Sequence, residues 1–425
     1  MYFTVKIEHE IPVIAEYDVI VVGGGPAGVS AAVSSARVGA KTALVERYGY
    51  LGGQATGGLV ILLVGLTDGK ERIIKGFCEE TIQALEKLNS TQNIGNHVLF
   101  DPESMKYIFD GSIRENSITP YYHSFVSDVV RENGKVCGVV LEGKSGKRVL
   151  KAKMFVDATG DADLAKFADI AFEQRNKTEA MPVTLGFRTG GIDTVKVSGF
   201  IRENYAVYQD ILRYLGISTK MGGWIHTVHK NEAWFNISNI ENIDITNPDD
   251  LTQAEIIGRK QIQDIIEKFK KEIPGFEDAY LIDTASQIGV RESRRVKGLY
   301  YFTKDDVTGI FSNAVCLAPD YTRSGKGFVQ VPFECLITKD SDNIIFGGRC
   351  ISFDYNLQDM FREIPCCMAT GQAAGVSAAV AVKNSCTLHG LNIKDVQQAL
   401  EQQGVILSKA VNSMSVNERI INTMQ

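Results

Sequence analysis

The sequence predicts an α/β protein in which a parallel sheet carries a β-meander and is interrupted by an inserted α+β domain. Three observations support this fold class. A strand, a glycine-rich turn and a helix follow one another over residues 17–38, Asn133-Gly134 is a hairpin signal, and the sequence pattern changes at residue 172. With 425 residues, 44% of them hydrophobic, the chain is long enough for two or three folding units.

The composition argues against two classes of partner. A formal net charge of -6 provides no general attraction for nucleic acid or an anionic membrane. The first ten residues, MYFTVKIEHE, lack the basic and apolar regions of a signal peptide, and the run LVILLVGL is too short to span a bilayer. We therefore expect a cytoplasmic protein with neither a nucleic-acid nor a membrane partner.

The cysteines do not predict a metal site. The chain has 8 of them, and no two have the CxxC spacing of a zinc or thioredoxin-like motif. We expect reduced thiols in the cytosol and no metal ligand set. The adjacent pair Cys366 and Cys367 follows Pro365, and we interpret both as buried, inert thiols.

The first element pair is a strand and a helix joined by glycines. Residues 17–22 read YDVIVV, typical of a parallel strand that is covered on both faces. The next residues match GxGxxG through Gly23, Gly25 and Gly28, and small and apolar residues at helical spacing then continue to residue 38. This order of strand, turn and helix is the context that the motif requires.

Each glycine has a physical reason in a dinucleotide site. Gly23 allows a tight turn, Gly25 leaves room for a pyrophosphate, and Gly28 lets the helix pack closely on the strand. The second strand, KTALVE, ends at Glu46, where a carboxylate can accept hydrogen bonds from ribose hydroxyls. The pattern favours a Rossmann-like dinucleotide-binding domain. The alternatives are a structural glycine turn and, for Glu46, a solvated strand end.

A second glycine cluster, LGGQATGG, follows Glu46 almost directly. A plain NAD-binding domain has no need for another close backbone approach at this place, whereas a longer cofactor does. The alternative is a flexible loop.

The remaining elements can be read from periodicity and breakers. Apolar residues at spacings of three and four predict helices over 73–88 and 102–116. β-formers over 119–143 flank the Asn133-Gly134 turn and predict the meander. The segment KMFVDATGDADLAKFAD predicts a strand, a turn and a helix, and its acidic residues are also suited to capping that helix.

The sequence pattern changes in the middle of the chain. Strand-like pieces, VTLGFRTGGID and EAWFNISNI, precede a polar helix over 251–272 that Pro274-Gly275 ends. We therefore divide the chain into a first part of the cofactor domain (1–171), an inserted substrate or cap domain (172–278) and a returning part (279–425). The returning part contains a strand in NIIFGGR and a small-residue helix, IPCCMATGQAAGVSAAVAV.

Taken together, these segments resemble a known family. YDVIVVGGGPAG, LVERYGYLGGQATGG, VDATGDADLA, PGFEDAYLIDTASQIGVRESRR, NIIFGGRCIS and PCCMATGQAAG occur in the order found in the FAD-dependent oxidoreductases. These are two-domain flavoproteins related to the FAD folds of glutathione reductase and succinate dehydrogenase. The resemblance runs from about residue 10 to about residue 407.

The resemblance implies FAD bound in an extended form, with pyrophosphate at the first glycine turn, adenosine ribose at the end of the second strand, and the ribityl chain and flavin along the second glycine cluster. The cofactor-binding residues it implies are Gly23, Gly25, Pro26, Ala27, Gly28, Glu46, Arg47, Gly52, Gly53, Gln54, Ala55, Thr56, Val126, Thr159, Gly160, Asp161, Gly348 and Arg349. Val126 would meet the adenine through its backbone, Thr159 to Asp161 would close over the cofactor, and Gly348 and Arg349 would approach the flavin ring.

The helix that begins near Pro365 has a further interpretation. If its N-terminus points at the pyrimidine side of the flavin, its positive end stabilises the negative charge that appears there on reduction. The alternative is a helix that only packs through alanine and glycine.

The sequence departs from the family at the reaction centre. Tyr355 stands where the family often has a histidine, and a second family histidine near Asp320 is absent. We take Tyr355 and Arg291, from the segment GVRESRR, as the catalytic candidates. For Arg291 the alternative is a solvated or salt-bridged charge run, and neither His226 nor His229 is assigned a role.

The predicted function is an FAD-dependent oxidoreductase that transfers a hydride between a small organic substrate and flavin N5. A disulfide reductase is disfavoured because no second GxGxxG and no CxxC is present. The alternative from another class is a non-catalytic FAD-binding module for redox sensing or interaction. A homo-oligomer and a protein electron donor or acceptor stay open as partners, and the sequence does not identify the substrate.

Overall fold

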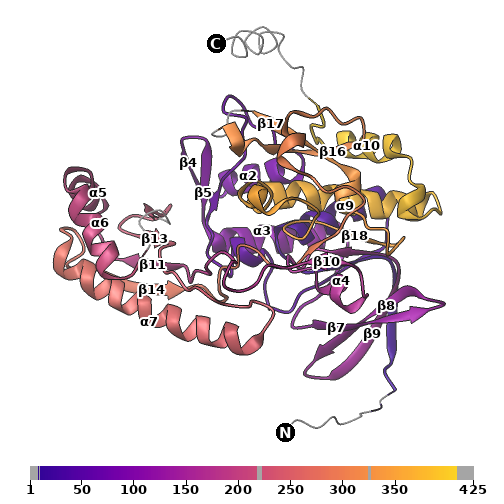
Figure 1. Cartoon of the computed structure of the whole chain (residues 1–425), viewed down its shortest axis with the longest axis horizontal. Coiled ribbons are helices and arrows are strands. Elements are labelled where there is room, and N and C mark those ends of the chain that lie inside the picture. The colour runs from indigo at the N-terminus through magenta and orange to yellow at the C-terminus, as the bar shows by residue number, and fades with distance from the viewer. Residues whose placement is uncertain (1–7, 9, 218–222, 324–326, 409–425) are drawn as a thin grey trace.

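The main sheet confirms the α/β prediction. The computed structural model describes residues 8, 10–217, 223–323 and 327–408 (Figure 1). Neighbouring parallel strands of this sheet are, in spatial order, β6 (Thr119–Tyr121), β2 (Thr42–Val45), β1 (Val13–Val22), β9 (Gly146–Asp157) and β18 (Ile344–Phe346). Strands β1 and β2 are buried where they pair, as expected for apolar runs covered on both faces.

The predicted β-meander is an extension of the same sheet. Strand β7 (Phe125–Glu132) pairs antiparallel with β8 (Lys135–Gly143), which pairs antiparallel with the first half of β9. The turn residues Asn133 and Gly134 have φ values of 54° and 80°, the left-handed conformation that a tight hairpin turn needs. Strand β9 therefore belongs to the meander at one end and to the parallel sheet at the other.

Helices α1 (Pro26–Val38) and α9 (Ile364–Lys383) pack against each other at backbone distance. A Cβ atom at Gly371 would lie 2.1 Å from the Ala27 carbonyl oxygen, and one at Gly375 would lie 2.1 Å from that of Ala31. The Ser30 hydroxyl donates to the Met368 carbonyl at 2.7 Å across this contact. Only glycine permits this approach at residues 371 and 375.

Helix α9 is also long and apolar enough to cross a membrane by length and composition, with a mean hydropathy of 1.3. The whole of that apolar window is buried inside the protein. Its hydrophobicity is therefore explained by its position in the core of the fold (Figure 1).

Smaller elements surround this core. The helices are α2 (Phe77–Lys87), α3 (Pro102–Glu115), α4 (Asp163–Phe167), α8 (Gln358–Phe361) and α10 (Ile393–Gln402). The strands form three small sheets: β3 (Leu62–Leu63), β5 (His97–Phe100) and β4 (Thr91–Ile94); β16 (Ala314–Pro319) and β17 (Phe328–Pro332); β10 (Phe172–Glu173) and β15 (Arg295–Val296). Helix α3 closely matches the predicted helix over 102–116. Helix α2 begins at Phe77, later than the predicted start at residue 73.

The inserted segment forms its own antiparallel sheet and helices, seen on the left in Figure 1. The strand order is β12 (Trp224–His226), β13 (Ala233–Phe235), β11 (Phe187–Gly190) and β14 (Tyr280–Thr284). The helices are α5 (Thr194–Glu203), α6 (Tyr205–Tyr214) and α7 (Pro248–Glu272). The predicted boundary at residue 278 falls just before β14, which pairs with β11 and completes this sheet.

Helix α7 packs on one face of that sheet through aromatic side chains. Phe187 and Phe235 stack with ring centroids 4.8 Å apart, and Phe269 of α7 lies 6.0 Å from Phe235. The helix begins earlier than the expected residue 251 because the Asn247 side chain accepts from the Asp249 amide at 2.8 Å and Pro248 occupies the first turn.

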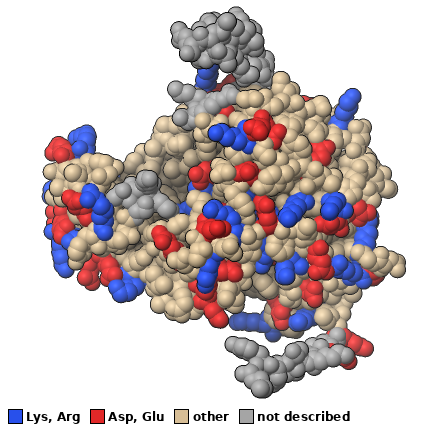
Figure 2. Space-filling model, viewed as in Figure 1, with Lys and Arg blue, Asp and Glu red and all other residues tan. Residues whose placement is uncertain are grey.

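Charged side chains of both signs are interspersed over the face of the molecule shown in Figure 2. This distribution matches the small net charge in the sequence. No single-sign field dominates that face.

The α1–α9 contact leads to a stability prediction. Gly375→Ala should lower the free energy of unfolding by about 1–3 kcal/mol, because the new methyl group collides with the Ala31 carbonyl. Denaturant unfolding of both proteins measures this change.

The control is Gly111→Ala within α3, where a Cβ atom meets nothing within 4 Å. That substitution should stabilise the protein by about 0.5–1 kcal/mol, since alanine is the better helix residue. Equal effects of the two substitutions would contradict the packing account.

Candidate functional site

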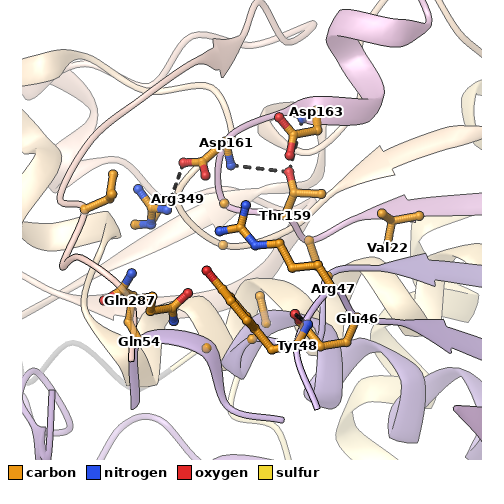
Figure 3. A pocket seen from close by; sticks show the side chains of 18 of the residues that line it. Val22, Glu46, Arg47, Tyr48, Gln54, Thr159, Asp161, Asp163, Gln287 and Arg349 are labelled. Atoms are coloured by element: carbon orange, nitrogen blue, oxygen red, sulfur yellow. Dashed lines mark hydrogen bonds and ion pairs between the residues drawn. The ribbon is translucent and has the colours of Figure 1, made fainter. Parts of the chain in front are cut away.

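A cavity of about 340 Å³ opens where β1, β2 and β9 end (Figure 3). Val22 and Val45 line it at the ends of β1 and β2, and Ala158 lines it directly after β9. In open parallel sheets ligands bind outside the carboxyl ends of the strands, which is where this cavity lies.

The GxGxxG turn forms one wall of the cavity. Gly23 has φ 96°, and a Cβ atom there would lie 2.6 Å from the Ala158 carbonyl oxygen. A Cβ atom at Gly28 would lie 1.7 Å from the Gly23 carbonyl oxygen, so helix and turn touch through backbone. These two glycines have the packing roles that the sequence predicts.

Gly25 differs because a Cβ atom there meets nothing within 4 Å. It is the N-cap of α1, and Gly25, Pro26 and Ala27 line the cavity. The space in front of Gly25 is therefore open at the positive end of a helix, where unpaired amides favour an anion. This arrangement fits a pyrophosphate.

Glu46 is a built part of the site rather than a solvated strand end. Its side chain is buried, and its two oxygens accept from the Gly24 amide at 2.6 Å and the Tyr48 amide at 2.9 Å. Burial raises the pKa of the Glu46 carboxyl, against the effect of these amide hydrogen bonds. Glu46 ties the end of β2 to the glycine turn, and with Arg47 it lines the cavity.

A second turn, after β9, is organised by the fully buried Asp157. Its carboxylate accepts from the Thr159 hydroxyl at 2.7 Å and from the Leu164 amide at 3.0 Å at the start of α4. Burial, followed by the charge of Asp163, raises the pKa of Asp157 to about 6. Asp157 therefore accepts from a first-turn amide of α4, although Ala162 is the N-cap residue, and it also holds Thr159 at the cavity.

The same turn is joined to the returning part of the chain. The Asp161 carboxylate binds Arg349 at 3.0 Å, an ion pair visible in Figure 3. Gly160 has φ 79°, and a Cβ atom there would lie 2.6 Å from an Arg349 nitrogen. The predicted residues Thr159, Gly160, Asp161 and Arg349 all line the cavity.

Two buried polar atoms of the cavity wall lack a hydrogen-bond partner among the described residues: Arg349 Nη1 and Gln54 Oε1. The other end of the Gln54 amide donates to the Ile288 carbonyl at 3.1 Å, which fixes its orientation. Because buried polar groups are normally paired, these atoms fit a polar ligand in the cavity. The open space at Gly25 and these unpaired atoms fit FAD.

Some residues of the second glycine cluster, LGGQATGG, line the cavity, and others hold the shape of the turn. Gly53 and Gln54 line the cavity, whereas Gly52, Ala55 and Thr56 are not among its lining residues. Gly52 has φ 100°, and the Thr56 hydroxyl donates to the Leu51 carbonyl at 2.6 Å, which closes the turn. The cluster is an ordered turn and not a flexible loop.

The far end of the cavity is formed by Gly348 and the start of α9. The Gly348 amide donates to the Thr370 hydroxyl at 3.0 Å, and Cys367 lines the cavity from the first turn of the helix. Burial raises the pKa of the Cys367 thiol to about 12 and that of Cys366 well above its usual value. Both thiols therefore lack the thiolate character of a nucleophile, as the sequence predicts.

Val126 of the meander also lines the cavity, at the position predicted for the adenine. It precedes a register shift between β7 and β8, which breaks the regular ladder next to the cavity.

The two catalytic candidates are not among the residues that line this cavity. Arg291 follows the lining residue Val290, and its guanidinium donates to the Pro182 carbonyl at 2.5 Å. The Tyr355 ring lies 3.3 Å from the Arg295 guanidinium carbon, and its hydroxyl is buried without a partner among the described residues. Their catalytic roles stay predictions.

Several lining residues are absent from the predicted set. Tyr48 and Gln287 project into the cavity beside Arg47 and Gln54 (Figure 3). The inserted segment contributes Ile245, Leu251, Thr252 and Glu255. The sequence signals a helix over 251–272 but contains nothing that places its first turns at the cavity.

In the part of the chain that the structure describes, no group of three or more His, Cys, Asp or Glu side chains is arranged to hold a metal ion.

The fold, the cavity and the family match given next together define a flavoprotein of the Rossmann-like class, with FAD as cofactor. The sequence profile of the FAD dependent oxidoreductase family matches residues 18–400. The chain belongs to the FAD dependent oxidoreductase family.

Similarity to individual proteins is more limited. The chain is 57% identical over 42 residues to the dihydrolipoyl dehydrogenase of Trypanosoma brucei brucei, which is 10% of this chain and 9% of that protein. It is 22% identical over 322 residues to the NADH:fumarate oxidoreductase of Klebsiella pneumoniae (strain 342), which is 72% of this chain and 31% of that protein. The chain thus spans well under two thirds of the length of these relatives.

Among solved structures, a geranylgeranyl bacteriochlorophyll reductase-like protein from Thermoplasma acidophilum matches with a TM-score of 0.50 and 15% identity. The match covers 92% of this chain and 82% of that one. It supports the fold alone.

The open space at Gly25 leads to a prediction about the cofactor. Gly25→Val should abolish FAD retention while leaving the fold intact, because a Cβ atom there meets nothing within 4 Å and the branched side chain occupies the space left for the pyrophosphate. The measurement is the FAD released per polypeptide on denaturation, together with the circular dichroism spectrum.

Gly199→Val in α5 is the matched control, since a Cβ atom there also meets nothing within 4 Å but lies away from the cavity. It should keep its FAD. Full FAD content in Gly25→Val would show that the pyrophosphate lies elsewhere.

Proposed function

We propose that this chain transfers a hydride between a small organic substrate and FAD. The observation that supports the proposal best is the continuity of the cavity, from Glu46 and the glycine turn to Arg349, Gly348 and the first turn of α9. An extended dinucleotide cofactor needs such a channel. FAD, when bound, supplies a hydride acceptor or donor at its N5 position.

The residues at the far end of the cavity are suited to hold a redox centre rigidly. Arg349 is fixed by Asp161, and Gly348 is fixed by the Thr370 hydroxyl. The first turn of α9 faces the cavity through Cys367, so its unpaired amides favour negative charge there. Precise positioning of this kind is the main contribution that a protein makes to hydride transfer.

Arg291 is the residue we propose for substrate binding. It is adjacent to the wall residue Val290, and its surroundings include Arg362 and Glu363. Burial, followed by the charge of Arg362, lowers the pKa of Arg291 to about 10, so the side chain remains a cation at neutral pH. A partly buried cation favours a substrate that carries a carboxylate or a carbonyl group.

Tyr355 is proposed as a proton partner or a positioning group. The Arg295 guanidinium packs on its ring, and its hydroxyl lacks a partner among the residues described. A buried hydroxyl of this kind is available to a ligand that reaches it.

An anaerobic reduction experiment tests the proposed reaction. The purified, FAD-containing protein is mixed with a panel of small carboxylic and carbonyl compounds, with NADH and NADPH as separate additions. One of the organic compounds should bleach the flavin absorbance in a saturable manner. If tightly bound FAD responds to no compound of a broad panel, the alternative of a non-catalytic redox-sensing or interaction module is favoured instead.

Arg291 and Tyr355 can be separated once a reducing substrate is found. Arg291→Ala should leave the FAD content unchanged and weaken substrate binding, since it removes the proposed cation. Tyr355→Phe should slow flavin reduction with little change in binding, because it removes only the hydroxyl. Stopped-flow reduction over a range of substrate concentrations measures both effects.

Tyr301→Phe is the control for the tyrosine, since that hydroxyl donates to Glu173 at 3.2 Å and its ring is partly exposed. Its reduction rate should match that of the unmodified protein. Unchanged kinetics in both Arg291→Ala and Tyr355→Phe would remove these residues from the proposed mechanism. A cytoplasmic location, a homo-oligomer and a protein electron partner likewise stay predictions.

A further inference from the structure

The inserted domain reaches the cofactor cavity through the first turns of α7. Leu251, Thr252 and Glu255 line the same cavity as Glu46 and Arg47. Leu251 and Glu255 are four residues apart on the helix and therefore lie on one face of it. In Figure 1, α7 extends from the inserted sheet toward the meander strands of the main sheet.

The Glu255 carboxylate lies near the end of β2. Burial is the largest cause of the raised pKa of the Tyr48 phenol, and the negative charges of Glu46 and Glu255 raise it further. Arg259 donates to one Glu255 oxygen at 3.0 Å, and the Glu255 side chain remains 24% exposed. Tyr48 lies two residues after Glu46, which is the predicted acceptor for the ribose hydroxyls. Glu255 is thus a second carboxylate close to Tyr48.

The first turns of α7 are held in this position from both sides. Just before the helix, the Gln174 side chain donates to Asp244 at 3.1 Å, and in its first turn Asp250 binds Lys177 at 3.1 Å. Within the helix, a Cβ atom at Gly258 would lie 2.8 Å from the Leu185 side chain, so α7 packs tightly on the inserted sheet. The part of α7 that lines the cavity is therefore held by the segment at 174–177 and by the inserted sheet.

We propose that α7 of the inserted domain is an FAD-binding element at the adenosine end of the cavity. Leu251 supplies an apolar contact to the adenosine half of the cofactor, and Glu255 is a second acceptor for its ribose hydroxyls. These residues line the same cavity as Glu46 and Arg47, so removing their contacts speeds the release of FAD. This inference depends on FAD binding and not on the reaction proposed above.

The rate of FAD release tests the proposal. Leu251→Ala and Glu255→Gln should each release FAD about tenfold faster than the unmodified protein, a change that corresponds to about 1.4 kcal/mol. The release rate is measured by diluting the loaded protein into buffer without FAD and following the rise in free flavin fluorescence. The unfolding midpoint of each apoprotein shows whether the fold is intact.

Two controls lie on the same helix. Ile256→Ala changes an exposed side chain that is not among the lining residues, and it should alter the release rate less than twofold. Arg259→Gln removes the ion pair of Glu255 but not its carboxylate. If Arg259→Gln accelerates release as much as Glu255→Gln, the effect belongs to the ion pair and the ribose role is wrong. Release rates within twofold of the unmodified protein in both Leu251→Ala and Glu255→Gln overturn the proposal.

Hydrogen exchange provides an independent readout. Adding FAD to the apoprotein should slow amide exchange in a peptide covering 251–258 at least as much as in one covering the glycine turn. A peptide from the end of α7, covering 264–272, should change little. Equal exchange of the 251–258 peptide with and without FAD also overturns the proposal.

Discussion

The backbone contact between α1 and α9 is the constraint on which the rest of the structure depends. Gly371 and Gly375 bring α9 onto the carbonyls of Ala27 and Ala31, two segments that are more than 300 residues apart in the chain. This contact sets both helix N-termini at one cavity, α1 at the pyrophosphate turn and α9 at the far end. One interface therefore determines the distance between the two positive helix ends at the cavity.

Local patterns in the sequence predicted several of the main elements and many of the residues that line the candidate site. The glycine turn, Glu46, the Asn133-Gly134 hairpin and α9 are each encoded within a few residues, by conformational needs that only certain side chains meet. Contacts between distant segments were not predictable in this way. Examples are the Asp161–Arg349 ion pair and the contact of Gly375 with α1, because each partner has many possible locations until the chain is folded.

The charged segment GVRESRR shows why the chemistry is harder to predict than the fold. Arg294 binds Asp163 at 2.9 Å, and Arg295 packs on Tyr355 and donates to Gln358 at 3.2 Å. Most of the charge in this segment is thus used in contacts with neighbouring elements, and only Arg291 lies next to a wall residue of the cavity. Likewise, the periodicity of α7 predicted a helix, but only tertiary packing brings Leu251 and Glu255 to the cofactor cavity.

Strand β9 pairs with the meander strand β8 and with the parallel strands β1 and β18, and this affects the order in which the chain folds. Strands β1, β2, β6, β7, β8 and β9 all lie within the first 157 residues, so most of the main sheet can assemble early during synthesis. Strand β18 joins β9 only after the inserted domain has been made, and α9 follows it. Until then the part of α1 that packs on α9 has no cover, and parallel pairing over such a sequence separation is slow. The nascent chain is therefore most exposed to aggregation while the inserted domain is being translated.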